Sequence, residues 1–362
     1  MKDILNKIQN DIKLSPDDLL QILELEDNDI LQQIYKEAYR IKLENIGNKV
    51  YFRGIIEFSN ICAKNCYYCG IRKDNRDVKR FKMNEEAIIR MAKWTYENNY
   101  GSLVLQGGEI ESPEHASFIE HILKRIKKET SNKLGITLSL GEQSYDVYKR
   151  WFDAGAHRYL LRIESSNPEL YRKLHPADHN FERRLKCLRD IKKAGYQTGT
   201  GVMQGLPGQS MQDLVNDILF FEKEDVDMLG MGPYIVHNST PLAAKVKDFD
   251  GARQFQLGLK MIALCRIYLK DINIAATTAL QALHPEGREL GLLAGGNVIM
   301  PNITDTEYRD SYKLYEDKPC CDENAQSSKD NLEKKIKEIG EVIAYSEWGD
   351  SKHFFKRKAS DQ

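Results

Sequence analysis

Short β-rich runs alternate with amphipathic helical stretches from residue 53 onward, and this alternation limits the fold more than any other feature of the sequence. The eight strand candidates are 54–58, 102–106, 135–140, 158–163, 197–203, 227–231, 273–277 and 297–300. The helical patterns between them are 85–98, 115–129, 145–154, 181–193, 211–223 and 255–269. Eight strands, each followed by a helix, predict an α/β fold of the (β/α)8 barrel type. A doubly wound open sheet is the alternative, which eight consecutive units disfavour.

The sequence before and after this region predicts two smaller parts. Residues 1–50 read as a helical extension, with Ser15 as an N-cap followed by Pro16 and two aspartates. We expect the barrel to cover 51–345, with a polar loop at 317–335 and a last helix at 332–344. Residues 346–362 form the predicted C-terminal tail, frayed after Trp348.

Composition narrows the class of protein. The chain has 362 residues, of which 41% are hydrophobic, enough for one barrel with extensions. The formal net charge of −1 does not favour nucleic acid or an anionic membrane as a partner. The N-terminus lacks the apolar core of a signal peptide, and no apolar run reaches the ~18 residues of a membrane span. Seven cysteines without disulfide-framework spacing favour a cytoplasmic location.

Three cysteines stand directly after the first predicted strand. Cys62, Cys66 and Cys69 have the spacing C-x3-C-x2-C. Three thiolates can ligate three corners of a 4Fe–4S cube and leave the fourth iron open for a substrate. A structural zinc ion would require four ligands, and the next Cys and His downstream are as far away as Cys187 and His115. The spacing therefore favours an iron–sulfur cluster over zinc.

The cysteine motif resembles the signature of the radical S-adenosylmethionine (SAM) superfamily, C-x3-C-x-aromatic-C, with Tyr68 as the aromatic residue. The resemblance implies that the amino and carboxylate groups of SAM chelate the open iron. It also implies that one-electron reduction cleaves SAM to methionine and a 5′-deoxyadenosyl radical.

The same resemblance implies a set of SAM-binding residues at the ends of later strands. In the superfamily, a glycine pair contacts the SAM amino group, residues after the fourth strand contact its carboxylate and ribose, and a glycine-rich stretch lies along the adenine. The corresponding residues here are Gln106, Gly107, Gly108, Glu109, Arg162, Glu164, Met203 and Gly205. Two alternatives stay open: Arg162 and Glu164 could form only a strand-end salt bridge, and 201–208 could be an ordinary Gly/Pro turn.

A closer resemblance covers residues 25–320. The stretches 56–60, 66–70, 138–142, 159–164, 230–234, 276–279 and 297–302 are similar to the HydE family, the radical SAM maturases of FeFe-hydrogenase. The resemblance implies a role in H-cluster assembly, on a small iron complex that carries cysteine, carbon monoxide and cyanide. The substrate-site candidates that it implies are Arg184, Met228, His237, Thr277, Thr278, Tyr308, Arg309 and Tyr312.

Simpler interpretations apply to some of these residues. Tyr308 and Tyr312 are one helical turn apart and could be core residues, and Met228 could serve packing alone. Some HydE relatives have three C-terminal cysteines that hold a second cluster. This chain has only the adjacent Cys320 and Cys321 there, so we expect a single cluster.

Other functions stay open at this stage. A biotin synthase-like or methylornithine synthase-like enzyme would share the barrel and the cysteine loop. A non-catalytic Fe–S scaffold is the alternative from another class, and the SAM-binding residues count against it. The resemblance implies a reductant such as a flavodoxin or ferredoxin, and other hydrogenase maturases, as partners.

Overall fold

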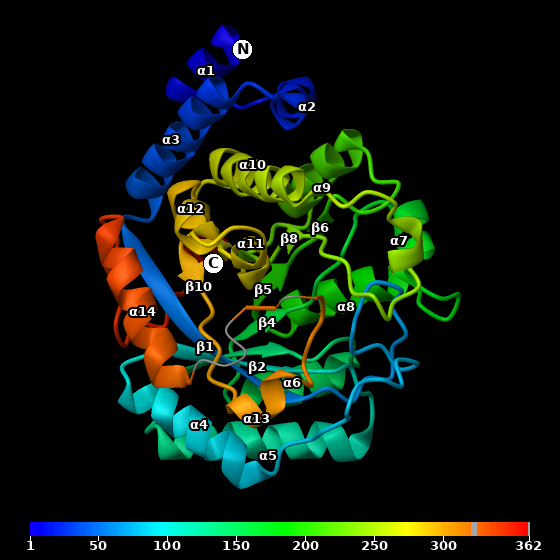
Figure 1. Ribbon diagram of the computed structural model, residues 1–362. Helices are drawn as coiled ribbons and strands as arrows, with labels where there is room; N and C mark the ends of the chain where they lie inside the picture. Colours follow the sequence, from blue (N-terminus) through cyan, green and yellow to red (C-terminus); the bar gives the residue numbers. More distant parts are fainter. Residues whose placement is uncertain (317, 320–323, 361–362) are drawn as a thin grey trace.

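In the computed structural model, which describes residues 1–316, 318–319 and 324–360, the eight predicted strands lie in chain order around a parallel barrel (Figure 1). They are β1 (Lys49–Ser59), β2 (Ser102–Gly107), β3 (Gly135–Ser139), β4 (Arg158–Leu160), β5 (Gln197–Thr200), β7 (Met228–Leu229), β9 (Asn273–Ile274) and β10 (Val298–Ile299). β10 pairs with β1, and a parallel bridge between Ala275 and Val298 joins β9 to β10. The ring of neighbouring strands is therefore complete, and the open-sheet alternative is wrong.

Two further strands extend the barrel wall beyond β5 and β7. β6 (Met203–Gln204) and β8 (Gly232–Pro233) pair in parallel, with Met203 opposite Gly232. The strands are continuous apolar runs, as expected for strands covered on both faces. Ile56, Leu103, Ile136 and Leu138 are all fully buried in one apolar cluster with the surrounding helices.

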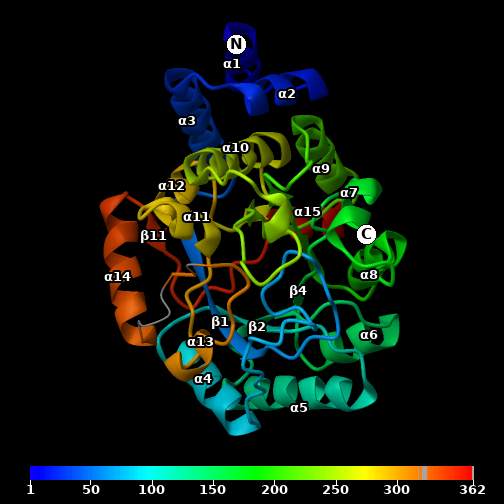
Figure 2. The ribbon, with the colours of Figure 1, turned by 45° about the vertical axis from the view of Figure 1, so that its right-hand side comes forward.

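Helices surround the strands, as Figures 1 and 2 show. They are α4 (Glu85–Glu97), α5 (Pro113–Glu129), α6 (Tyr145–Asp153), α7 (Pro168–Leu174), α8 (Phe181–Lys193), α9 (Met211–Lys223), α10 (Gly251–Leu269), α11 (Thr278–Leu283), α12 (Gly287–Leu293) and α13 (Thr306–Arg309), with a 3-10 turn at Ala243–Lys245. Each amphipathic helix turns its apolar side inward. α5 does so with Ile119, Leu123 and Ile126, and Ser112 caps its N-terminus. In the described part of the chain, no helix combines the length and hydropathy that crossing a bilayer requires.

The N-terminal extension is helical, as predicted. α1 (Lys2–Gln9), α2 (Pro16–Glu24) and α3 (Asn28–Asn45) share one apolar cluster with α9 and α10. The predicted N-cap at Ser15 is confirmed, because its hydroxyl accepts a hydrogen bond from the backbone N–H of Asp18. The division of the chain after residues 50 and 345 stays a prediction.

The region after the barrel differs from the sequence-based prediction. α14 (Ala325–Glu338) replaces most of the predicted polar loop and ends before the predicted end of the last helix. Asn324 caps it, Leu332 and Ile336 bury its inner side, and Gly340 with φ of 78° follows its end. β11 (Val342–Ile343) then pairs with β1.

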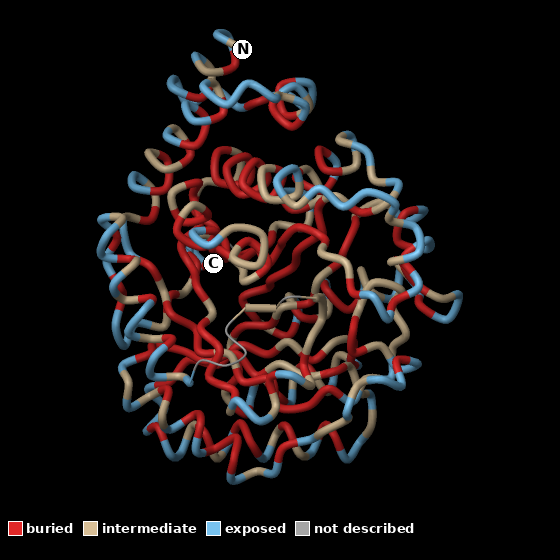
Figure 3. The backbone as a smooth tube through the Cα atoms, viewed as in Figure 1, coloured by how far each residue is buried: buried red, intermediate tan, exposed pale blue. Residues whose placement is uncertain are grey.

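The prediction of a frayed tail after Trp348 is wrong for the described residues. Gly349–Ser351 plug the amino end of the barrel, and α15 (Lys352–Ser360) covers it. Gly101 makes this approach possible, because a Cβ there would lie 1.6 Å from the carbonyl oxygen of Glu347. In Figure 3 the buried backbone follows the strands, and exposed backbone lies on the outer helices and loops.

Candidate active site

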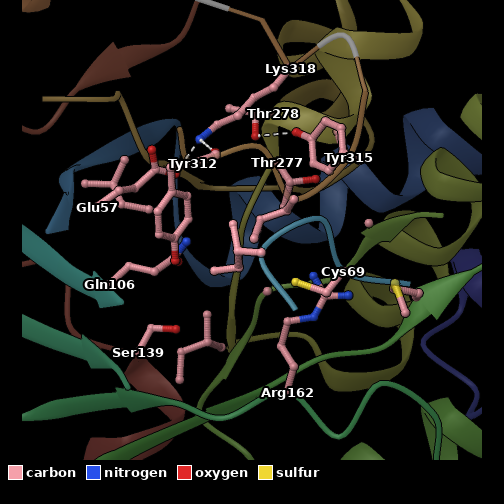
Figure 4. A pocket seen from close by; sticks show the side chains of 18 of the residues that line it. Glu57, Cys69, Gln106, Ser139, Arg162, Thr277, Thr278, Tyr312, Tyr315 and Lys318 are labelled. Carbon is pink, nitrogen blue, oxygen red and sulfur yellow. Dashed lines mark hydrogen bonds and ion pairs between the residues drawn. The ribbon is translucent and has the colours of Figure 1, made fainter. Parts of the chain in front are cut away.

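A cavity of about 320 Å³ opens at the carboxyl ends of the strands (Figure 4), the end where barrel enzymes place their sites. Fifteen of the predicted site residues line it: Cys62, Cys66, Tyr68, Cys69, Gln106, Gly107, Gly108, Glu109, Arg162, Glu164, Arg184, Met203, Thr277, Thr278 and Tyr312. These residues come from the ends of most strands of the barrel. Their convergence requires the closed fold and is not a local property of any motif.

The cysteine loop is held by hydrogen bonds to its backbone. The guanidinium of Arg80 donates to the carbonyls of Asn60, Ile71 and Arg72 at 2.6–2.8 Å. The backbone N–H of Tyr67 donates to Leu174, and the N–H of Glu109 points at the Sγ of Cys62 at 3.4 Å. The loop is therefore fixed in place on β2 and α7.

The three thiols share a buried environment. Burial raises the pKa of the Cys62 and Cys66 thiols, and the other two cysteines raise that of Cys66 further. Burial and Cys62 together raise the pKa of Cys69 to about 12. Three neighbouring thiolates would therefore require a positively charged group between them.

The glycine pair after β2 lies against the cysteine loop. A Cβ on Gly108 would lie 2.2 Å from the carbonyl oxygen of Ile61 and 2.9 Å from the Cα of Cys62. Only glycine fits this contact, because both neighbours are backbone atoms. The pair therefore presents bare backbone to the cavity beside the first cysteine.

Arg162 and Glu164 combine charge with backbone strain. Glu164 has φ of 66°, a left-handed conformation that is costly for a residue with a side chain. Its Oε2 lies 2.9 Å from Nη2 of Arg162, yet neither atom forms an aligned hydrogen bond. The Nε of Arg162 also lacks a partner. Buried polar atoms without partners are rare, so these point to a polar ligand in the cavity.

A network of charges lies behind this pair. Arg184 Nη1 lies 3.0 Å from Glu109 and 3.3 Å from Glu142, and Lys64 Nζ lies 2.9 Å from Glu142 and 3.2 Å from Glu109. Burial alone would raise the pKa of Glu142, but Arg184 and Lys64 outweigh it and hold that pKa below its usual value. Glu142 lay inside a stretch similar to HydE but was not predicted as a site residue. The network joins the cysteine loop to β3 and α8.

The far side of the cavity carries hydroxyl groups and a buried ion pair. Oγ1 of Thr278 lies 3.0 Å from the Tyr315 hydroxyl, and Oγ1 of Thr277 has no hydrogen-bond partner. Lys318 Nζ donates to Glu57 at 2.5 Å and to the Tyr312 carbonyl at 3.0 Å. Figure 4 shows Lys318 and Tyr315 on one side of the cavity and Arg162 on the other.

Sequence reasoning missed Glu57, Asn302, Tyr315 and Lys318 as cavity residues. Glu57 offered a usable signal, because a charged residue in an apolar strand two positions before the barrel mouth requires a partner. Its partner Lys318 is 261 residues away, and the sequence carries no sign of that distance.

Five predicted site residues lie outside the cavity. Gly205 packs against Gln254, His237 packs against Gly70, and the ring of Tyr308 packs against Phe81 in a tilted arrangement. Arg309 is buried and donates to the carbonyls of Thr304 and Asn302. Met228 lies at the opposite end of the barrel, where its sulfur accepts from Arg53.

The remaining cysteines divide into two groups. Cys187 and Cys265 are buried within α8 and α10, as predicted for small apolar residues. Cys320 and Cys321 lie outside the described residues.

Comparison with known proteins identifies the family. The sequence pattern of the Radical SAM superfamily, whose members use a 4Fe–4S cluster and SAM, matches residues 56–221. The fold is similar to that of methylornithine synthase (PylB), with a TM-score of 0.81 at 22% identity, covering 95% of this chain and 98% of that one. 3-Methylornithine synthase of Methanosarcina acetivorans is 26% identical over 81% of each chain. The [FeFe] hydrogenase maturase subunit HydE of Thermotoga maritima is 43% identical over 98% of this chain and 99% of its own. The chain therefore belongs to the HydE family of radical SAM enzymes.

Proposed function

We propose that this chain acts in the assembly of the FeFe-hydrogenase H-cluster, as a radical SAM enzyme in the cytoplasm. The observation that carries the proposal is the 43% identity, over nearly the full length of both chains, to a maturase subunit named HydE. The substrate that we propose is a small iron complex bearing cysteine, carbon monoxide and cyanide. Other hydrogenase maturases are proposed partners, and a flavodoxin or ferredoxin is the proposed reductant.

Cys62, Cys66 and Cys69 are the proposed cluster ligands. One observation supports the fit: the three thiols border one cavity at the carboxyl ends of the strands. When bound, the cluster and SAM supply a strongly hydrogen-abstracting organic radical. The barrel wall surrounds the place where that radical would act, which would limit its contact with water and stray hydrogen donors.

The residues along the first side of the cavity are the proposed SAM site. Arg162 would pair with the carboxylate of SAM, and Glu164 would accept hydrogen bonds from its ribose, which would give their unpartnered atoms partners. The backbone of Gly107 and Gly108 would face the amino group. Tyr68, Gln106, Glu109 and Met203 complete the proposed site.

The opposite side of the cavity is the proposed substrate site. It keeps three of the predicted residues, Thr277, Thr278 and Tyr312. We add Tyr315 and Lys318 because they line the same side. An anionic complex suits this lining, since its hydroxyl groups can donate hydrogen bonds, and Lys318 offsets the negative charge of Glu57 at the same wall. Arg184 pairs with Glu109 and Glu142, so we assign it a positioning role. Gly205, Met228, His237, Tyr308 and Arg309 are left out of the site.

We propose one cluster per chain. The double variant Cys320→Ser, Cys321→Ser should keep about four irons per chain and its rate of SAM cleavage, because one three-cysteine site accounts for all of them. Loss of about two irons in that variant would require a 2Fe–2S site on these thiols.

Complementation tests the maturase assignment. The chain should restore hydrogenase activity to a strain that lacks its own HydE, and Cys66→Ala should remove that activity again. If the strain stays inactive while a biotin auxotroph grows with the same gene, the maturase assignment is wrong and the fold and SAM chemistry remain.

A further inference from the structure

The segment around the cysteine loop is rich in basic residues. Residues 61–82, between β1 and α4, contain seven Lys and Arg and only two Asp. The whole chain has a formal net charge of −1, so the rest of it is net negative. Positive charge is therefore concentrated on the loop that carries the three cysteines.

Three of these cations face solvent and have no ion-pair partner. Lys73, Arg76 and Lys79 are exposed and form no ion pair within 4 Å with any described residue. Asp74 and Asp77 are exposed in the same stretch, so residues 73–79 carry three cations and two carboxylates. A net positive charge of this surface is therefore accessible to a partner.

An apolar surface lies beside the cations. Ile61 is 41% exposed and directly precedes Cys62, and Ala63 follows it on the surface. Because the carbonyl of Ile61 contacts Gly108, this exposed stretch rests directly on the cavity wall. A protein that covered Ile61 would lie one residue from the first thiol.

The loop that carries this surface is rigid before any partner arrives. Arg80 ties the carbonyls of Ile71 and Arg72 to that of Asn60, and Asn60 Nδ2 donates to the carbonyls of Lys79 and Ser311 at 2.8 and 2.6 Å. A preorganised surface loses little conformational entropy on binding, so a small interface can be sufficient for a complex.

We propose that the surface formed by Ile61, Lys73, Arg76 and Lys79, here called the basic face, is the docking site of an acidic electron-transfer protein. The partner class is a reduced flavodoxin or 2Fe–2S ferredoxin, which loses one electron while the cluster gains it. An apolar centre with a charged rim is typical of a protein interface, and redox complexes are small and electrostatically steered. The proposal rests on the proposed function, because only a cluster on the three cysteines needs this electron.

The test compares two charge-reversal variants. The first is Lys73→Glu, Arg76→Glu, Lys79→Glu. The matched control is Lys36→Glu, Lys128→Glu, Lys223→Glu, which reverses three exposed cations on α3, α5 and α9 that form no ion pair among the described residues. Iron content and the melting temperature are measured for both variants. If the first variant loses iron, the milder variant Lys73→Ala, Arg76→Ala, Lys79→Ala replaces it.

Two readouts separate docking from chemistry. Titration with an acidic flavodoxin should give a Kd at least tenfold higher for the first variant than for wild type and control, and the salt dependence of Kd should flatten. Reduction of the cluster by the small reductant dithionite should be equally fast in all three proteins.

Two results would overturn the inference. One is an unchanged flavodoxin Kd in the first variant, and the other is a basic face that binds an RNA oligonucleotide more tightly than flavodoxin. Either would leave the proposed function intact. If dithionite reduced no cluster in the wild-type protein, the proposed function itself would be wrong.

Discussion

The two ends of the barrel use buried charge in different ways. At the amino end, the side chains of Arg158 and His157 meet Asp350, and Arg53 donates to the carbonyl of Gly349, leaving a cavity of about 20 Å³. At the carboxyl end, Arg162 and Glu164 border a cavity of about 320 Å³. The C-terminal segment fills one end of the barrel, while the other end keeps a cavity that is large enough for ligands. We therefore expect changes at the amino end to reduce stability, and changes at the carboxyl end to reduce function.

Removing a cysteine should have the largest effect at the carboxyl end. Cys62→Ala, Cys66→Ala or Cys69→Ala should abolish the cluster and SAM cleavage, because two thiolates cannot hold three corners of the cube. Iron analysis and the visible absorbance of anaerobically reconstituted protein measure this. Cys187→Ala is the matched control and should keep its iron, since Cys187 lies in α8 among apolar residues. Stoichiometric zinc without charge-transfer absorbance would contradict the cluster assignment.

At the amino end, Asp350→Asn should give the largest loss of stability. It leaves the fully buried Arg158 without its carboxylate, a change that costs roughly 3 kcal/mol in the free energy of unfolding. Chemical denaturation at pH 7 measures it, and Asp153→Asn, which breaks an exposed pair with Lys149, should cost less than about 1 kcal/mol. Asp350→Asn should still bind SAM as wild type does. If SAM affinity fell while stability stayed unchanged, the assignment of stability to the amino end and of function to the carboxyl end would be wrong.

The pH dependence of this effect has a definite sign. Burial opposes ionisation of Asp350, but His157 and Arg158 outweigh it and hold its pKa below the usual value. Its contribution to stability is therefore present above the unfolded pKa of about 3.9 and is lost as the pH falls toward the folded pKa. The difference between wild type and Asp350→Asn should start to shrink below pH ~4.

Arg162→Ala and Glu164→Ala should change ligand binding and leave stability nearly unchanged. Each removes a proposed charged partner of SAM, a contact worth roughly 1–3 kcal/mol, which corresponds to an affinity loss of about 5- to 150-fold. Equilibrium binding of SAM to cluster-loaded protein measures this, and Arg189→Ala, which breaks an exposed pair with Glu224, is the control. Unchanged affinity in both variants would mean that Arg162 and Glu164 form only a strand-end salt bridge.

The smallest expected effect concerns Asp217 on α9. Its Oδ1 accepts from the backbone N–H of Ser166 at 2.7 Å, its Oδ2 has no partner, and burial raises its pKa to about 7. A raised carboxyl pKa makes stability fall as the pH rises from about 4 to 7. Asp217→Asn should therefore be more stable than wild type at pH 8 by about 1 kcal/mol, and similar to it at pH 4. Equal stability of the two proteins at pH 8 would show that the carboxylate is solvated.

Local sequence patterns predicted much of this structure. Buried parallel strands are continuous apolar runs, so all eight could be predicted from the sequence, and the Ser15 cap could be predicted from a short motif. The cysteine loop is local as well, because its spacing lies within eight residues. The resemblance to HydE, which the comparison confirmed, rested on such stretches at strand ends.

Tertiary structure decided the partners of the buried charges. Lys318 pairs with Glu57, Glu142 joins Lys64 to Arg184, and Asp350 pairs with Arg158, each across a separation that no local pattern encodes. The predicted frayed tail failed for the same reason, because polar residues such as Asp350 and Ser351 become buried only when a finished barrel offers them partners. The sequence alone determined which chemistry this protein carries, since cysteine spacing and strand periodicity are properties of neighbouring residues. Only the tertiary structure decided which end of the barrel is sealed and which stays open, since that depends on contacts of the C-terminal segment with barrel residues far away in the sequence.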